Sequence, residues 1–356
     1  MTDAGWRRVV ERGIERRAFP SAVVEVGRRD GVLARHAFGR LTYADDAPPA
    51  TENTIYDLAS LTKVMATTPR AMQAFEVGML TLEDRVAAYL PEWRGEDRES
   101  VTIGDLLEHA SGLTAYLPFF RDHQGRAEFQ RAICTMPLEY APRTKSIYSD
   151  LGFILLGFVV EDRGFPLKDA FRLKPEATSE GPSRLKAGAS PDLSFGVSRE
   201  QQPCCAPTEL DIWRGRMLQG EVHDENAYVL GGIAGHAGMF GTAEGVGDFA
   251  REVLKGLAGE ETFARPETFA RFARKSGVPG SSRALGWDTM LPTSSCGTRL
   301  SPRAIGHTGF TGTSLWIDPE RDLYVAFLTN RVHPQRDNNG IQAVRRALHD
   351  AIVDSL

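Results

Sequence analysis

The sequence predicts an α+β fold, in which an antiparallel sheet flanked by helices is interrupted by an inserted all-helical domain. Strand-like runs lie near both ends of the chain, and short turns separate the runs near the C-terminus. The section between them shows apolar residues at helical rather than alternating spacing. Both chain ends are therefore expected to build one unit. The expected domains are 1–68 together with 230–356 for the α/β unit, and 69–229 for the mostly helical insertion with an irregular segment at 165–207.

The first elements follow from apolar spacing and one turn signal. Residues 3–17 have the spacing of an amphipathic helix. Two strand-like runs follow, Ser21–Gly27 and Val32–Phe38, and the Asp-Gly pair between them favours a hairpin. A helix is then expected from Ser60 to Gly78, because apolar residues fall on one helical face. Pro69 lies inside this pattern and should kink or break the helix.

The middle of the chain is expected to be helical, with loops rich in Gly and Pro. Short helical patterns occur at 82–90, 103–109 and 127–136. The run Leu151–Val160 is apolar all round, which predicts a buried helix. Ser149 immediately precedes this helix and is a preferred N-cap residue.

The C-terminal section returns to strands. The last three strand candidates have short turns between them, which predicts an antiparallel meander. The elements expected here are helices at 243–257 and 266–274, strands at 284–287, 303–310, 314–317 and 323–328, and a closing helix at 340–353.

Composition and charge narrow the class of protein. The chain has 356 residues, 42% hydrophobic and 25% charged, as in ordinary globular proteins. A formal net charge of −5 gives no electrostatic case for binding nucleic acid or an anionic membrane. The N-terminus lacks the pattern of a secretory signal, and the longest apolar run is too short to span a bilayer. We therefore expect a cytoplasmic protein, and its four cysteines are expected to be free thiols.

Ser60 and Lys63 form the first candidate catalytic pair. Residues three apart share a helical face, so the amine of Lys63 can reach the hydroxyl of Ser60 at the start of the helix. Unpaired backbone N–H groups there favour developing negative charge, which suits an activated nucleophile. Alternatively, Ser60 only caps a core helix. Ser183 and Lys186 have the same spacing, but the Gly- and Pro-rich run around them predicts a loop.

Two further groups of polar residues are candidates for the site. Tyr148 precedes the buried helix, whose packing would hold the phenol as a proton relay. Asn226 and His236 are expected at the rim of a cleft, within Gly-rich sequence.

A metal site near this rim is the other possibility. His223, Asp224, Glu225 and His236 have metal-binding side chains, but adjacent residues do not all project to one side. We favour the interpretation that these side chains make structural hydrogen bonds rather than bind a metal, so we expect no metal and no cofactor.

Three motifs give the chain its resemblance to a known family. They are Ser60-Leu61-Thr62-Lys63, Tyr148-Ser149-Asp150 and His307-Thr308-Gly309. In order and setting they are similar to the motifs of the serine β-lactamase and penicillin-binding-protein superfamily. Most of the chain resembles its class C β-lactamase-like branch, which includes D-Ala-D-Ala carboxypeptidases, D-aminopeptidases, esterases and some acyltransferases.

The resemblance implies a mechanism through an acyl-enzyme. Ser60 would attack a carbonyl carbon while Lys63 and Tyr148 accept its proton, and Tyr148 would protonate the leaving group. The backbone N–H groups of Ser60 and Phe310 would form the oxyanion hole. The residues that the resemblance implies for substrate binding are Asp150, His307, Thr308, Gly309 and Phe310.

Two departures from the family pattern bear on the substrate. Asp150 stands where many relatives have Asn, and an ionised carboxylate cannot donate a hydrogen bond. His307 replaces a common lysine, and its charge depends on pH. Both favour a peptidase or esterase over efficient antibiotic hydrolysis, with a small molecule or short peptide as substrate. An acyltransferase on the same scaffold and a non-catalytic ligand sensor are the alternatives, and the sequence leaves the oligomeric state open.

Overall fold

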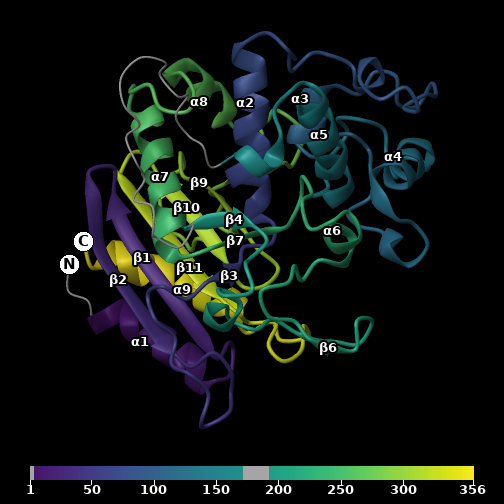
Figure 1. Ribbon diagram of the computed structural model, residues 1–356. Helices are drawn as coiled ribbons and strands as arrows, with labels where there is room; N and C mark the ends of the chain where they lie inside the picture. Colours follow the sequence, from purple (N-terminus) through teal and green to yellow (C-terminus); the bar gives the residue numbers. More distant parts are fainter. Residues whose placement is uncertain (1–3, 171–191) are drawn as a thin grey trace, which may run out of the picture.

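A six-stranded antiparallel sheet forms the centre of the sheet domain. The computed structural model describes residues 4–170 and 192–356. The strand order is β2-β1-β11-β10-β9-β8, so strands from the two chain ends meet where β1 pairs with β11 (Figure 1). The strands are β1 (Ser21–Arg28), β2 (Gly31–Gly39), β8 (Asp288–Thr289), β9 (Ile305–Thr308), β10 (Ser314–Asp318) and β11 (Leu323–Thr329). The hairpin and the C-terminal meander are thus confirmed, as is the α+β class.

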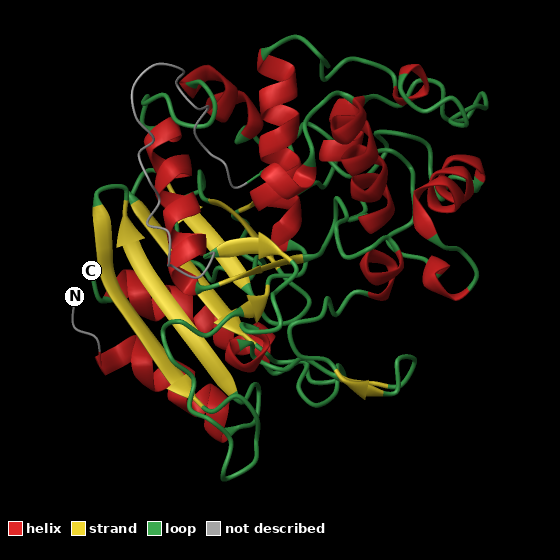
Figure 2. Ribbon diagram, viewed as in Figure 1, coloured by secondary structure: helices red, strands yellow, loops and turns green. Residues whose placement is uncertain are grey.

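Helices cover both faces of this sheet. Helices α1 (Ala4–Glu15) and α9 (Ile341–Asp354) pack together on one face, and α7 (Ala243–Leu257) packs on the other (Figure 2). The alternation of side chains along a strand explains the two cores. In β1, Val24 and Val26 join the core under α1 and α9, whereas Val23 joins the core under α7.

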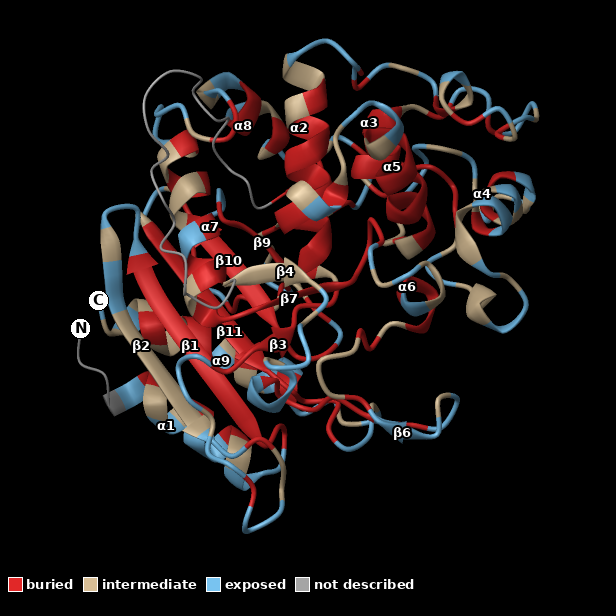
Figure 3. Ribbon diagram, in the orientation of Figure 1, coloured by how far each residue is buried: buried red, intermediate tan, exposed pale blue. Residues whose placement is uncertain are grey.

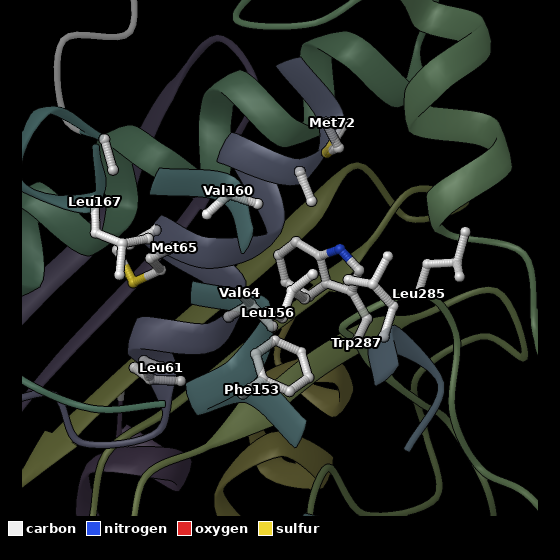
Figure 4. Close-up of a cluster of buried hydrophobic side chains, with 14 of the residues drawn as sticks. Leu61, Val64, Met65, Met72, Phe153, Leu156, Val160, Leu167, Leu285 and Trp287 are labelled. Carbon is white, nitrogen blue, oxygen red and sulfur yellow. The ribbon is translucent and has the colours of Figure 1, made fainter. Parts of the chain in front are cut away.

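The helical region lies beside the sheet and shares the larger core. Its helices are α2 (Thr68–Glu76), α3 (Ile103–Leu107), α4 (Gly125–Thr135), α5 (Asp150–Asp162) and α8 (Pro266–Phe272). Helix α5 is buried along most of its length (Figure 3). Its Phe153 and Leu156 pack with Val64, Met72 and Trp287 in this core (Figure 4). The strands of the sheet all lie within 1–68 and 230–356, although the domain boundaries themselves stay a prediction.

Several local predictions were wrong for identifiable reasons. The segment 82–90 holds only a 3-10 turn, Val86–Ala88, because Asp84 accepts hydrogen bonds from the backbone and hydroxyl of Thr81. The strand expected at 284–287 is interrupted by Gly286, whose φ of 86° is incompatible with extended backbone.

Short elements between α5 and α7 were also missed. They are β4 (Leu193–Phe195), β5 (Leu210–Asp211), β6 (Arg216–Met217), α6 (Glu225–Val229) and β7 (Met239–Gly241). Residues 171–191 of the expected irregular segment lie outside the described residues, as do Ser183 and Lys186. Among the helices of the described residues, none is long and apolar enough to cross a membrane.

Candidate active site

Ser60 lies at a turn that buried polar groups hold in place. It follows β3 (Tyr56–Asp57), and Ala59 adopts an unusual positive φ of 47°. The Asp57 carboxylate accepts hydrogen bonds from the backbone N–H groups of Ala59 (2.8 Å) and His223 (2.7 Å). The hydroxyl of Thr311 donates to the carbonyl of Asp57 at 2.7 Å. The turn is therefore fixed to two segments that are distant in sequence.

Lys63 is placed one helical turn after Ser60 and is fully buried. It begins a π-helical segment, Lys63–Thr67, that runs directly into α2. This π-helical turn, in which the N–H of Thr68 donates to the carbonyl of Lys63, comes immediately before Pro69, where the sequence predicted a kink or break. Nζ of Lys63 lies 3.0 Å from Oγ of Ser60, 2.7 Å from Oδ1 of Asp150 and 3.0 Å from the carbonyl oxygen of His236.

Tyr148 completes the group around the Ser60 hydroxyl. Its phenol donates a hydrogen bond of 2.8 Å to Oγ of Ser60. The next residue, Ser149, caps α5 by accepting a hydrogen bond from the N–H of Gly152, as expected. Its N–H donates to Nδ1 of His109 at 3.0 Å, and the His109 ring lies 4.8 Å from the Tyr148 ring. The start of a buried helix thus positions the phenol.

Burial separates the proton affinities of the groups that surround Ser60. Burial lowers the pKa of Lys63, and the carboxylate of Asp150 only partly opposes this. Burial raises the pKa of Tyr148 well above its usual value, and Asp150 raises it further. The pKa of His307 is lowered well below its usual value by burial, then by Lys63 and Arg283. The site therefore favours a neutral phenol and a neutral imidazole, beside an amine that loses its proton more easily than usual.

Ser60 opens into a cavity of about 570 Å³. Tyr148 and Asp150 line it together with the four residues His307, Thr308, Gly309 and Phe310, so all of the expected substrate-binding residues meet here. The expected oxyanion donors, the N–H groups of Ser60 and Phe310, have no hydrogen-bond acceptor within 4–170 and 192–356.

His307 is carried by β9, one strand inside the edge of the sheet. The short edge strand β8 pairs only with Ile305 and Gly306, so His307 and Thr308 extend beyond it. Nδ1 of His307 lies 2.9 Å from the carbonyl oxygen of Thr308.

Asn226 and His236 do not form the expected rim, because both are buried behind the cavity wall. Asn226 accepts a hydrogen bond from the N–H of Phe120 and donates one to the carbonyl of Leu117, which ties α6 to that loop. Nε2 of His236 lies 2.8 Å from Oδ1 of Asp224. Asp224 itself lines the cavity.

Comparison with known proteins identifies the family. The sequence model of the Beta-lactamase family matches residues 6–171 and 183–349. The chain belongs to this family. A relative from Escherichia coli (strain K12), provisionally named a D-alanyl-D-alanine carboxypeptidase, is 31% identical over 364 residues, which cover 90% of this chain and 82% of the relative. An N-acetylmuramyl-L-alanine amidase from Bacillus subtilis (strain 168) is 31% identical over 360 residues, which cover 92% of this chain and 81% of the relative.

Solved structures with the β-lactamase-family fold superpose on nearly the whole chain. A penicillin-binding protein homologue from Caulobacter crescentus aligns with a TM-score of 0.74 at 17% identity, covering 99% of this chain and 97% of that one. A class C β-lactamase from Rhodobacter sphaeroides aligns with a TM-score of 0.71 at 20% identity, covering 99% of both chains. At these identities the comparison shows the shared fold.

Within this β-lactamase-family site, sequence reasoning missed residues that act through other residues. Asp57 accepts the N–H of Ala59 two positions later, a pattern typical of Asp in turns that could have been recognised. Arg283, whose guanidinium lies 5.2 Å from the centre of the Tyr148 ring, carries no local sequence signal. Across the described residues, no cluster of three or more His, Cys, Asp or Glu could hold a metal ion.

Proposed function

We propose that this chain is a serine hydrolase that forms an acyl-enzyme on Ser60. The observation that carries the proposal is the convergence of two groups on one hydroxyl: Nζ of Lys63 at 3.0 Å and the phenol of Tyr148 at 2.8 Å. Both distances are within the range required for proton transfer. Simple helix capping by Ser60 would not require a buried lysine and a partly buried tyrosine at the same oxygen.

Lys63 is the better proton acceptor of the two. A neutral amine has two N–H groups and one lone pair, and Lys63 has three partners. Donation to Asp150 and to the carbonyl of His236 directs the lone pair toward Ser60. The lowered pKa of Lys63 and the raised pKa of Tyr148 both favour this assignment over the shared role expected from the sequence.

The reaction then follows in balanced steps. Oγ of Ser60 bonds to the carbonyl carbon, and its proton moves to Lys63. Negative charge develops on the carbonyl oxygen, where the N–H groups of Ser60 and Phe310 would stabilise it, each by about 3 kcal/mol. The bond to the leaving group breaks, and Tyr148 donates its proton to that group while taking one from Lys63. Water then releases the acyl group by the reverse sequence.

The substrate that fits best is an amide or ester of a short peptide. The cavity carries charge of both signs, from Asp150, Asp224 and Arg283 among others, which suits a molecule with several polar groups. Two relatives carry the names of amide-cleaving enzymes, one provisionally a carboxypeptidase and the other an amidase, which supports an amide substrate. Asp150 and the neutral His307 remove the donor and the positive charge that would favour efficient antibiotic hydrolysis.

Covalent labelling tests the proposal. The wild-type chain is incubated separately with a fluorophosphonate, a penicillin and a nitrophenyl ester, and intact and peptide masses are measured. We expect a fluorophosphonate adduct on Ser60 and none in Ser60→Ala. Ser183→Ala removes the serine of the other Ser-x-x-Lys string, and this control should react like wild type. The proposal fails if no reagent modifies Ser60, or if ester turnover persists in Ser60→Ala.

Turnover assays then separate the substrate classes. D-Alanyl-D-alanine peptides, an N-acetylmuramyl-L-alanine peptide and nitrophenyl esters are compared, each with and without an added alcohol or amine. Hydrolysis that the added nucleophile leaves unchanged supports a hydrolase. Product in which the acyl group is carried by the added nucleophile would instead identify an acyltransferase.

A further inference from the structure

The loop around His236 is held tightly behind the catalytic lysine. Gly235 packs against Gly157 of α5 so closely that a Cβ at Gly235 would lie 2.0 Å from the carbonyl oxygen of Phe153. The hydroxyl of Thr67, one helical turn beyond Lys63, donates a hydrogen bond of 2.7 Å to the carbonyl of Gly235. Neighbouring carbonyls of this loop therefore accept hydrogen bonds from two residues of the helix that carries Lys63.

The side chain of His236 anchors the same loop on its other side. The ring is buried, and Nε2 lies 2.8 Å from Oδ1 of Asp224. That oxygen also accepts the N–H of Ala227 at 2.7 Å, so Asp224 is the N-cap of α6. Nδ1 of His236 has no hydrogen-bond partner among the described residues. Its bond to Asp224 is therefore what fixes the ring's orientation.

We propose that Asp224 and His236 are a positioning pair for Lys63, which holds the His236 carbonyl on Nζ and places a carboxylate charge behind the amine. The inference rests on the proposed function, because it assigns how the base of that reaction is oriented. Without the carbonyl at 3.0 Å, the amine would keep Asp150 as its strong acceptor, and its lone pair would no longer be directed at Ser60. A small misplacement of a reacting group can cost about 100-fold in rate.

The charges that face Lys63 come from several elements. Asp150 at the start of α5 and Asp224 at the start of α6 both raise the pKa of Lys63, whereas Arg283, before β8, lowers it. His109 and His307 face the same amine, and burial lowers the pKa of each well below its usual value.

Asp224 is held in its charged form. Burial opposes ionisation of Asp224, but His236, the N–H of Ala227 and Lys63 together lower its pKa below the usual range. Asp57, a buried carboxylate, also faces Asp224, and the pKa of Asp57 is raised by burial and, to a lesser extent, by the charge of Asp224. Asp224 is thus an anion that acts on Lys63 at working pH.

The test measures the rate at which a fluorophosphonate labels Ser60, as a function of pH, in variants that separate charge from position. Asp224→Asn keeps a side-chain oxygen for Ala227 and His236 but removes the charge that raises the pKa of Lys63. The acidic limb of the profile of labelling rate against pH should therefore move to lower pH by on the order of half a unit. His236→Phe keeps the ring volume but cannot reach Asp224, so labelling should slow by about 10- to 100-fold. His236→Gln retains a donor and should fall between His236→Phe and wild type.

Thr242→Ala is the matched control, because Thr242 caps α7 by the same kind of hydrogen bond but lies outside the cavity lining. It should lower the melting temperature without moving the acidic limb. An unchanged limb in Asp224→Asn, or labelling of folded His236→Phe within twofold of wild type, would overturn the inference. If His236→Phe does not fold, the inference is tested by whether the acidic limb of Asp224→Asn moves to lower pH. Failure of the proposed function is separate, since wild-type Ser60 would then not label.

Discussion

Lys63 and Asp150 form an ion pair of 2.7 Å although the side chain of Lys63 is completely buried. Burial makes an amine lose its proton more readily, whereas a carboxylate at this distance stabilises the protonated amine. The two influences oppose each other, and burial is the larger, so the pKa of Lys63 is lowered. Asp150 thus limits how easily Lys63 becomes the free base while directing one of its N–H groups. An Asn at this position, as in many relatives, would accept the same hydrogen bond from the amine but would carry no charge to stabilise its protonated form.

The first prediction concerns the pH dependence of kcat/KM. Asp150→Asn removes a charge that raises the pKa of Lys63, so the acidic limb of the profile should move to lower pH. Arg283→Gln removes a charge that lowers this pKa, so the limb should move to higher pH. The profile is measured with a nitrophenyl ester, since the limb reports the base of the free enzyme.

Opposite displacements by the two variants are the decisive feature. A general loss of activity would lower both profiles without moving their limbs in different directions. Movement of both limbs to the same side would contradict the assignment of Lys63 as the base.

The second prediction separates Tyr148 from Lys63. Tyr148→Phe removes the phenol that donates to Ser60 but leaves Lys63 and its two acceptors in place. Positioned acid catalysis contributes about 10²- to 10⁴-fold. We expect a loss of that order for an anilide, whose amine must be protonated as it leaves, and a smaller loss for a nitrophenyl ester. Equal losses on the two substrates would show that Tyr148 does not protonate the leaving group.

The motif residues could be predicted because three motifs resemble those of a known family in order and setting, and each setting has a local signal in the sequence. Ser60 precedes apolar residues at helical spacing, Tyr148 precedes an apolar run that predicts a buried helix, and His307 lies in a run that predicts a strand. These signals are local, and the fold only has to bring three such segments together. The strands of the meander were predicted for the same reason, since strand-like runs and the short turns between them are encoded within a few residues.

The supporting residues could not be predicted in this way. The carbonyl of His236 reaches Lys63 only because Gly235 lies against Gly157, a contact between segments far apart in the chain. Asn226 was expected at the rim, yet it is buried because its amide satisfies two backbone groups of the loop at 117–120. A polar residue in Gly-rich sequence looks the same whether it faces solvent or satisfies a buried backbone.

The third prediction tests that contact between backbones. A Cβ at Gly235 would lie 2.0 Å from the Phe153 carbonyl oxygen and 2.9 Å from the Cα of Gly157, and neither is a side chain that can move aside. Gly235→Ala should therefore lower the free energy of unfolding by about 1–3 kcal/mol, measured by urea denaturation. Gly277→Ala is the control, because a Cβ there meets nothing within 4 Å. Similar unfolding midpoints for the two variants would contradict this packing.

The fourth prediction concerns stability in acid, through a histidine outside the site. His349 of α9 is fully buried, and burial lowers its pKa to about 4, while its Nδ1 lies 2.7 Å from the carbonyl oxygen of Arg345. The unfolded chain, with an ordinary pKa near 6.5, binds a proton in this range that the folded chain does not. Acidification from pH 6.5 to pH 4 should therefore destabilise the fold, and the displacement of this pKa corresponds to about 3 kcal/mol.

His349→Asn isolates this contribution, because Asn does not titrate and its amide can still donate to the Arg345 carbonyl. The variant loses packing at every pH, so the quantity to compare is the slope of unfolding free energy against pH, obtained from urea denaturation. Burial also lowers the pKa of three other buried histidines, His109, His307 and His333, so they too favour the unfolded state in acid. All three are present in both proteins and cancel in the difference. The variant should show the flatter slope between pH 6.5 and 4. Parallel slopes would mean that the folded chain protonates His349 as readily as the unfolded chain does.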